Sequence, residues 1–263
     1  MVKVYTVPAF ADNYIWLVAG TPANRVAIVD PGEGEAVIAA LQQWQLVPAA
    51  ILITHHHRDH TGGIARLQQQ QPVTDPLPVF YPAAESIAGG NVALTDGDRV
   101  AIAGSDLCFQ AIATPGHTHG HLCYYGHGLL FSGDTLFSAG CGRLFEGSPA
   151  QMYQSLQRLA ALPAETKVYA AHEYTLDNLR FAAIAEPGNQ AITAWQQQAA
   201  AQRARAEPTL PTTLSQELAA NPFMRVDEPP LVAALTRYAG QPLPSGSERF
   251  AVLRAWKDHV DQS

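Results

Sequence analysis

The segment at residues 54–60 constrains the fold of this chain more than any other part of its sequence. It reads Thr-His-His-His-Arg-Asp-His, and five of its seven residues carry a possible metal ligand. The apolar run at 50–53 precedes it and Gly62-Gly63 follows it, a pattern typical of a buried strand, a loop and a helix start. Because imidazole nitrogens and carboxylate oxygens suit zinc, iron or manganese, the pattern predicts a metal site at a strand end.

The backbone geometry of this loop divides its ligands between two positions. In extended backbone, successive side chains point to opposite sides, so His55 and His57 share one side and His56 faces away. A turn after His57 would direct Asp59 and His60 towards a second position. One short loop therefore predicts the start of two neighbouring metal sites.

Three further candidate ligands, His117, Asp134 and His172, each follow an apolar, strand-like run. In layered α/β folds, sites gather where several strands end on one edge. Gly116 and Gly133 allow the backbone to turn sharply beside two of these ligands. The sequence therefore predicts that segments far apart in the chain converge on the loop at 54–60.

Together these positions supply six terminal ligands and one carboxylate, Asp134, whose two oxygens can bridge. Such a set leaves coordination open for solvent, and two metals about 3.5–4 Å apart can share one hydroxide. His121 ends a dense polar run and is open to a second interpretation, support of a ligand. The histidines expected to be ordinary surface or core residues are His56, His119, His121, His127 and His259.

Composition narrows the class of protein. The chain has 263 residues and a net charge of -7, which fits one large or two modest globular domains and disfavours nucleic-acid binding. No apolar run approaches the ~18 residues of a membrane span, and no signal peptide is evident at the N-terminus. Three cysteines cannot all pair within one chain, so a reduced, cytoplasmic setting is expected for Cys108, Cys123 and Cys141.

The pattern of elements changes along the chain. Short apolar runs predict strands at 3–7, 14–18, 26–29, 50–53, 79–81, 107–113, 122–125, 129–131 and 167–170. Helices are predicted at 35–45, 64–70, 150–162, 175–185, 190–206, 230–239 and 248–260. Strands interleaved with helices favour a layered α/β domain, followed here by an all-helical part. We therefore expect a boundary near Glu173, with domains at 1–172 and 173–263.

At its ligand residues the chain resembles the metallo-β-lactamase superfamily. Residues 54–60 fit the signature T-H-x-H-x-D-H, and the other three ligands fall in the remaining positions in order. The resemblance implies a four-layer αββα sandwich with the metals at one edge. It implies one site of His55, His57, His117 and Asp134, and a second of Asp59, His60, His172 and the bridging Asp134. Two divalent ions would occupy these sites, with zinc as the expected metal and iron or manganese as alternatives.

Over nearly its whole length the chain is similar to one family of this superfamily, glyoxalase II or hydroxyacylglutathione hydrolase. The similar segments are 10–14, 131–137, 140–143, 172–175, 221–223 and 254–257. The resemblance implies that the smaller helical C-terminal domain binds substrate. It also implies that Asp59 and Asp134 orient a hydroxide held by both metals, and that glutathione is contacted by Arg143, Tyr174, Arg254 and Lys257.

These implied contacts make chemical sense, because glutathione carries two carboxylates and cationic donors recognise carboxylates well. Phe145 stands where some relatives have tyrosine, so that hydroxyl contact is not expected. From the residues alone, the i, i+3 spacing of Arg254 and Lys257 favours a solvated helix face over a binding site.

The implied activity is hydrolysis of S-D-lactoylglutathione and related thioesters to D-lactate and glutathione, the second step of methylglyoxal detoxification. A single chain is expected to suffice, without a nucleic-acid or membrane partner. Alternatives are another hydrolase of this fold, such as a lactonase, β-lactamase or phosphodiesterase, and a glutathione persulfide dioxygenase, which uses one iron and fewer ligands. A di-iron electron carrier is disfavoured, because the chain shows no Gly-rich phosphate loop for a flavin.

Overall fold

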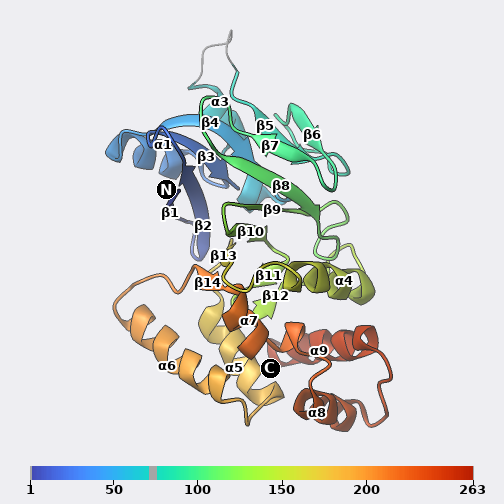
Figure 1. Ribbon diagram of the computed structural model, residues 1–263. Helices are drawn as coiled ribbons and strands as arrows, with labels where there is room; N and C mark the ends of the chain where they lie inside the picture. The colour runs from blue at the N-terminus through green and yellow to red at the C-terminus, as the bar shows by residue number, and fades with distance from the viewer. Residues whose placement is uncertain (1, 71–75, 263) are drawn as a thin grey trace. The chain divides into compact units, whose positions relative to one another are not determined.

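The computed structural model describes residues 2–70 and 76–262 (Figure 1). The chain divides into two compact units. Unit 1 comprises Met1–Ala113 and His119–Gly133, and unit 2 comprises Thr114–Thr118 and Asp134–Ser263.

A mixed six-stranded sheet forms the first layer of unit 1. Its strands run in sequence order, antiparallel from β1 to β3 and parallel from β3 to β6. They are β1 (Lys3–Ala9), β2 (Asn13–Ala19), β3 (Arg25–Val29), β4 (Val47–Leu52), β5 (Val79–Pro82) and β6 (Val92–Leu94). The helices of this unit are α1 (Gly34–Gln43), α2 (Arg58–Thr61) and α3 (Ile64–Gln68).

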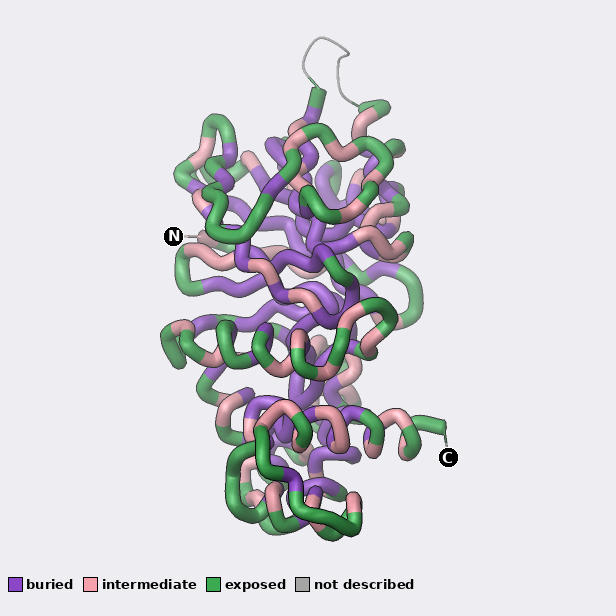
Figure 2. Tube along the Cα trace, turned by 90° about the vertical axis from the view of Figure 1, so that its right-hand side faces the viewer, coloured by how far each residue is buried: buried purple, intermediate pink, exposed green. Residues whose placement is uncertain are grey.

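Both faces of this sheet are buried. Ile15 and Leu17 on β2 pack in one cluster with apolar residues of α1 and α3. Trp16 and Val18 point to the opposite face, since side chains alternate along a strand, and they are buried as well. Every residue of β2 is accordingly buried, and Figure 2 colours such buried stretches of the chain purple. This burial explains the apolar runs that predicted the strands.

The remaining strands of unit 1 form an antiparallel succession, β7 (Arg99–Ala101), β8 (Cys108–Ala113), β9 (Leu122–Gly126) and β10 (Leu129–Gly133). This succession contacts the chain just after β4. The Tyr124 hydroxyl donates to the Ile53 carbonyl at 2.7 Å, and the Leu122 amide donates to the Thr54 carbonyl at 2.9 Å. The start of the histidine-rich loop is therefore fixed by hydrogen bonds to a second group of strands.

Unit 2 is mostly helical. Its strands are β11 (Leu136–Phe137), β12 (Gly140–Cys141), β13 (Lys167–Ala170) and β14 (Thr212–Thr213). Its helices are α4 (Pro149–Ala160), α5 (Thr175–Ala185), α6 (Gln190–Ala204), α7 (Leu214–Ala220), the 3-10 helix η1 (Pro222–Met224), α8 (Pro229–Ala239) and α9 (Gly246–Val260). Capping boxes at Ser148 and Ser245 start α4 and α9, and Gly240 ends α8 with a positive φ.

The expected α/β class and the helical C-terminal part are both found, and every predicted helix and strand has a counterpart within a few residues. The sequence did not predict β6, β7, β11, β12, β14 and α7. Each of these strands has three residues or fewer, too short for an alternating pattern. Within residues 2–70 and 76–262, no helix is long and apolar enough to cross a membrane.

Candidate metal centre and pocket

In unit 1, successive histidines of the loop after β4 point to opposite sides of the chain. Nε2 of His55 lies 3.0 Å from Nδ1 of His57. His56 turns away, and its Nδ1 lies 3.0 Å from Oε2 of Glu85. The alternation expected for extended backbone is therefore observed, and it brings His55 and His57 together.

The hydrogen bonds that begin at Asp30 determine which ring nitrogen of His55 and of His60 carries the proton. Asp30 accepts hydrogen bonds from the Thr54 amide at 2.8 Å and the Thr54 hydroxyl at 2.7 Å. Because that hydroxyl has donated its proton, it accepts from Nδ1 of His55 at 3.0 Å. Nδ1 of His60, 3.0 Å from Oδ2 of Asp30, must also donate to the carboxylate. Nε2 of His55 and of His60 then carries the lone pair that a metal requires.

The turn into α2 places the other two loop residues. Nε2 of His60 lies 3.4 Å from Oδ2 of Asp59. The same Asp59 oxygen accepts a hydrogen bond from the side-chain amide of Asn13 at 3.0 Å. His60 is fully buried, whereas Asp59 remains partly exposed. Asp59 and His60 therefore lie side by side as a second pair of possible ligands.

In unit 2, Asp134 stands between two histidines. Its Oδ2 lies 3.3 Å from Nε2 of His117, and its Oδ1 lies 3.4 Å from Nε2 of His172. The Arg143 carbonyl accepts from Nδ1 of His117 at 2.8 Å, which again leaves the lone pair on Nε2. Each oxygen of Asp134 therefore faces one imidazole, the arrangement expected of a bridging carboxylate.

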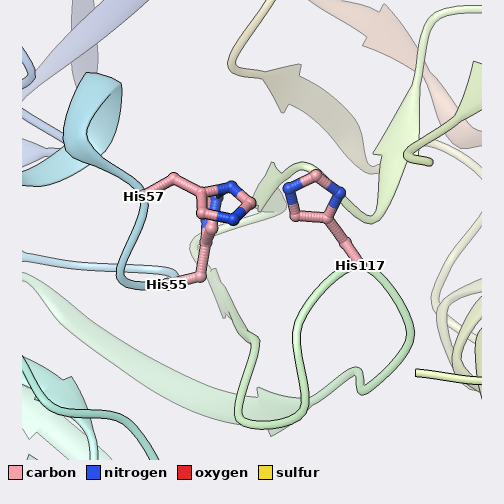
Figure 3. Close-up of side chains that lie close together, drawn as sticks. All are labelled: His55, His57 and His117. Atoms are coloured by element: carbon pink, nitrogen blue, oxygen red, sulfur yellow. Dashed lines mark hydrogen bonds between the residues drawn. The ribbon is translucent and has the colours of Figure 1, made fainter. Parts of the chain in front are cut away.

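The predicted ligands occur in three groups whose ligand atoms lie within 4.8 Å of one another. The groups are His55, His57 and His117; His55, His60 and Asp134; and Asp59, His60 and His172. Figure 3 shows the imidazole rings of the first group directed towards one another. A donor set of imidazole nitrogens and carboxylate oxygens suits zinc, iron or manganese, so the residues present fit such an ion.

Sequence analysis missed the residues that orient these ligands, above all Asp30 and Thr54. Asp30 follows β3 with a φ of 51°, so it sits at a strand end like the ligands themselves. The rule that sites gather at strand ends applies to Asp30 as well, but a single aspartate after a strand is too common for the rule to single it out. His121 had two interpretations, an ordinary core or surface residue or the support of a ligand. It is fully buried and stacks on His55 with ring centroids 5.0 Å apart, whereas His119, His127 and His259 are exposed.

A pocket with a volume of about 650 Å³ lies within unit 2. Its lining includes all four residues that the resemblance assigned to glutathione: Arg143, Tyr174, Arg254 and Lys257. It also includes the two candidate metal ligands His117 and Asp134. The pocket therefore combines possible metal ligands with a group of cations, which fits an anionic ligand.

Two of these cations are buried, contrary to a solvated helix face. Arg254 is 3% exposed and Lys257 is 6% exposed. The Arg254 guanidinium lies 5.1 Å from the Phe223 ring centroid, and the Lys257 ammonium lies 5.6 Å from the Phe181 ring centroid. Neither aromatic residue lies on α9, so only the tertiary structure reveals why these cations are turned inward.

Other features of the pocket follow from its composition. Tyr174 stacks on His172 with ring centroids 4.8 Å apart. Phe145, the residue without the hydroxyl, is 64% exposed and lies edge-on to His117 at 5.2 Å. Burial raises the pKa of the Cys141 thiol to about 11 despite the neighbouring Arg254, so Cys141 stays protonated and unreactive.

Comparison with known proteins decides the family. The metallo-β-lactamase superfamily matches residues 10–172, and the hydroxyacylglutathione hydrolase C-terminus matches residues 173–260. A hydroxyacylglutathione hydrolase from Pseudomonas paraeruginosa is 50% identical over 98% of this chain and 99% of that protein. This chain belongs to the hydroxyacylglutathione hydrolase family. The family assignment and the clusters of histidine and aspartate together indicate a divalent metal.

Solved structures agree on the fold. The crystal structure of ETHE1 from Myxococcus xanthus matches with a TM-score of 0.62 and 24% identity, over 98% of each chain. The crystal structure of TTHA1623 in a di-iron-bound form matches with a TM-score of 0.57 and 27% identity, over 84% of this chain and 99% of that chain. The hydroxyacylglutathione hydrolase family member described here therefore has the metallo-β-lactamase fold followed by a helical C-terminal region, as the resemblance implied.

Proposed function

We propose that this chain hydrolyses S-D-lactoylglutathione and related glutathione thioesters to D-lactate, or another 2-hydroxy acid, and glutathione. The observation that carries the proposal is the 50% identity, over 98% of the chain, to a hydroxyacylglutathione hydrolase. The cations of the unit 2 pocket support it, because the substrate carries two carboxylates. The reaction is the second step of methylglyoxal detoxification, and we assign it to a single cytoplasmic chain.

Two divalent ions complete the proposed site, zinc first, with iron or manganese as alternatives. The di-iron-bound form of TTHA1623 supports the number of two. The first ion is assigned to His55, His57, His117 and Asp134, and the second to Asp59, His60, His172 and the bridging Asp134. The short distances from both Asp134 oxygens to imidazole nitrogens support the bridging role.

When bound, such ions supply Lewis acidity, which brings the pKa of water to about 7 and polarises a carbonyl oxygen. The protein's own residues keep the site ready for this chemistry. Asp30 and Thr54 hold His60 and His55 in the tautomer that ligates through Nε2. Asp59 and Asp134 accept hydrogen bonds from the attacking water and orient it towards the thioester carbon.

The pocket holds the rest of the substrate. Arg143, Arg254 and Lys257 bind carboxylate, and Tyr174 forms part of the wall. The leaving group is the thiolate of glutathione, which is stable enough to depart without a strong general acid. We assign catalysis to a domain at 1–172 and glutathione binding to a helical domain at 173–263, a division supported by the ranges of the two matching family models.

The test is hydrolysis of S-D-lactoylglutathione by the purified, metal-loaded chain, with the metal content measured on the same sample. We expect His57→Ala and Asp134→Ala to lower kcat/KM by about a thousandfold or more, since several kcal/mol of charge stabilisation are lost. His127→Ala is the matched control, because His127 is exposed and belongs to none of the ligand groups. A wild-type chain that holds two metals and leaves the thioester intact would refute the proposal.

A further inference from the structure

The cations of the unit 2 pocket are already in contact with a carboxylate of the protein itself. Asp261 follows the last residue of α9 and lines the pocket. Its two oxygens lie 2.9 and 3.0 Å from Nζ of Lys257. Its Oδ2 lies 3.7 Å from Arg143 and 3.9 Å from Arg254. A single carboxylate therefore touches all three cations assigned to substrate binding.

A second aspartate shows what is particular to Asp261. Asp258 also pairs with Arg254, at 2.9 Å, but it does not line the pocket. Both aspartates face the same nitrogen of Arg254, but only Asp261 belongs to the pocket lining that a ligand would contact.

The cations have donors to spare. An arginine carries five N–H groups and a lysine ammonium carries three, more than one carboxylate can use. Nε of Arg254 is buried and makes no hydrogen bond, although Arg254 is only 3% exposed. A buried donor without a partner costs free energy, so the cluster is not fully satisfied by its own aspartates. An incoming carboxylate would gain contacts that Asp261 does not provide.

The sum of the charges in the cluster also indicates that it can accept a further carboxylate. Arg143, Arg254 and Lys257 carry three positive charges, and Asp258 and Asp261 carry two negative ones. Arg180 and Asp177 also line the pocket, but they pair with each other at 3.0 Å. The single positive charge that remains in the cluster matches one ligand carboxylate. Removing the charge of Asp261 would make the electrostatic potential more positive at the place where that carboxylate binds.

We propose that Asp261 is a built-in competitor, a carboxylate that occupies the pocket cations in the free protein and yields them to the carboxylate of the ligand. The inference rests on the proposed function, since it takes the ligand to be a glutathione derivative. Its consequence is a lower affinity for the substrate, because the ligand carboxylate must displace Asp261 from Lys257 and Arg143 before it can bind them.

The experiment compares two non-hydrolysable ligands by calorimetry on the metal-loaded, full-length chain. One is S-methylglutathione and the other is the same compound with both of its carboxylates converted to carboxamides. In Asp261→Asn, we expect the Kd of S-methylglutathione to fall by about threefold to fivefold, the upper part of the range typical of an exposed ion pair. The Kd of the carboxamide should change by less than about twofold, because it offers no charge to the freed cations.

Two further variants separate competition from a structural role. Asp261→Glu restores the carboxylate and should return the Kd to about the wild-type value. Glu207→Gln removes an exposed carboxylate that pairs with Arg205 outside the pocket, and it should leave both Kd values unchanged. Lower salt should enlarge the gain in Asp261→Asn, since the interaction is between charges.

The opposite results would overturn the inference. If Asp261 merely holds Lys257 in place, Asp261→Asn will leave the Kd of S-methylglutathione unchanged or raise it. An equal gain for the carboxamide would show that the effect does not involve the carboxylate. These outcomes are independent of catalysis, so a wild-type chain that binds S-methylglutathione but fails to hydrolyse the thioester would refute the proposed function and leave this inference standing.

Discussion

The histidine loop of unit 1 and the cation cluster of unit 2 hold polar side chains in opposite ways. In the loop, each partner can act in one direction only, since Asp30 can only accept and Thr54 has one proton to give. In the cluster, Arg254 and Lys257 are each paired with an aspartate one helical turn away. The loop therefore has a single proton order, whereas the cluster has partners that can be exchanged.

This difference fits what each region has to do. A ligand to a metal must present the same nitrogen at all times, and a fixed tautomer ensures this. A binding site for a charged group must release its own counter-ions and take them back. The comparison predicts that changes to the loop alter the site itself, and that changes around the cluster alter affinity or stability in smaller steps.

The largest effect on stability is expected at Glu217. This residue of unit 2 makes hydrogen bonds that are as directional as those of the histidine loop. Glu217 is buried and accepts hydrogen bonds from the Ala139 amide, the Thr212 hydroxyl and the Asn221 side chain. Asn221 in turn donates to the Gly140 carbonyl at the start of β12, which carries Cys141 at the pocket. Among the described residues, no cationic side chain pairs with Glu217, and its hydrogen bonds with neutral groups support one wall of the pocket.

Burial raises the pKa of Glu217 from 4.5 to about 7. The folded protein keeps this proton where the unfolded chain has lost it, so the contribution of Glu217 to stability is fully present below about pH 4.5 and is lost as the pH rises through about 7. The loss is up to about 3 kcal/mol. Glu217→Gln keeps a neutral group that can donate to Thr212 and accept from the other two partners, so it should remove this dependence.

The measurement is urea unfolding at pH 5 and pH 8 with the metal content held constant. The free energy of unfolding of the wild type should fall more between these pH values than that of Glu217→Gln. Glu207→Gln, at an exposed ion pair, should follow the wild type. Equal pH dependence in all three proteins would show that Glu217 ionises normally and that the wall is not held by a neutral network.

The next largest effect tests the loop itself through Asp30→Asn. Asparagine tolerates the positive φ of this position, so the backbone is preserved. Its amide can no longer accept from both Thr54 and His60, and the proton of His60 is driven to Nε2. We expect metal affinity or kcat/KM to fall by about 10- to 100-fold, as for other residues that orient metal ligands.

A chelator competition titration measures the metal affinity of Asp30→Asn. The control is Asp106→Asn, an exposed aspartate in the same unit that accepts from the Thr21 amide. If Asp30→Asn binds metal as tightly as the wild type, the tautomer of His60 is not controlled by Asp30. The contrast between a fixed loop and an exchangeable cluster would then fail.

The same contrast explains what the sequence could predict. His55, His57, Asp59 and His60 are neighbours in the chain, so the alternation of a strand and one turn suffice to group them. The more distant ligands each follow a strand, which is a signal that the sequence carries. Asp30 gives the same signal, but a single aspartate after a strand is too common to single out.

The cation cluster could not be predicted from local pattern. Arg254 and Lys257 have the spacing of a solvated helix face, and only the resemblance assigned them to a ligand. They are buried because Phe223, from η1, and Phe181, from α5, lie against them. Such contacts join segments far apart in the sequence, and the pattern of a single helix contains no record of them. The short strands β11 and β12 were missed for the same reason, since a network from α7 holds them.

The smallest effect is expected at Ser245. It tests whether the position of the cations in the cluster depends on their local ion pairs or on the whole of α9. Ser245 begins α9, with its hydroxyl accepting from the Glu248 amide at 3.2 Å. Ser245→Ala should cost about 1 kcal/mol of stability, the usual value for a lost N-cap. Lys257 lies roughly 18 Å further along the helix at 1.5 Å per residue, so the Kd of S-methylglutathione should stay within about twofold of wild type. Ser148→Ala removes the equivalent capping box of α4 and is the matched control.

Calorimetry and urea unfolding on the three proteins separate the two possibilities. Equal losses of stability with unchanged affinity would mean that the pairs of Lys257 and Arg254 with aspartates one turn away hold the cluster by themselves. A weaker Kd in Ser245→Ala alone would mean that the position of the entire helix sets the cations. The cluster would then be as rigidly determined as the histidine loop, and exchange of Asp261 for a ligand would have to move α9 as a unit.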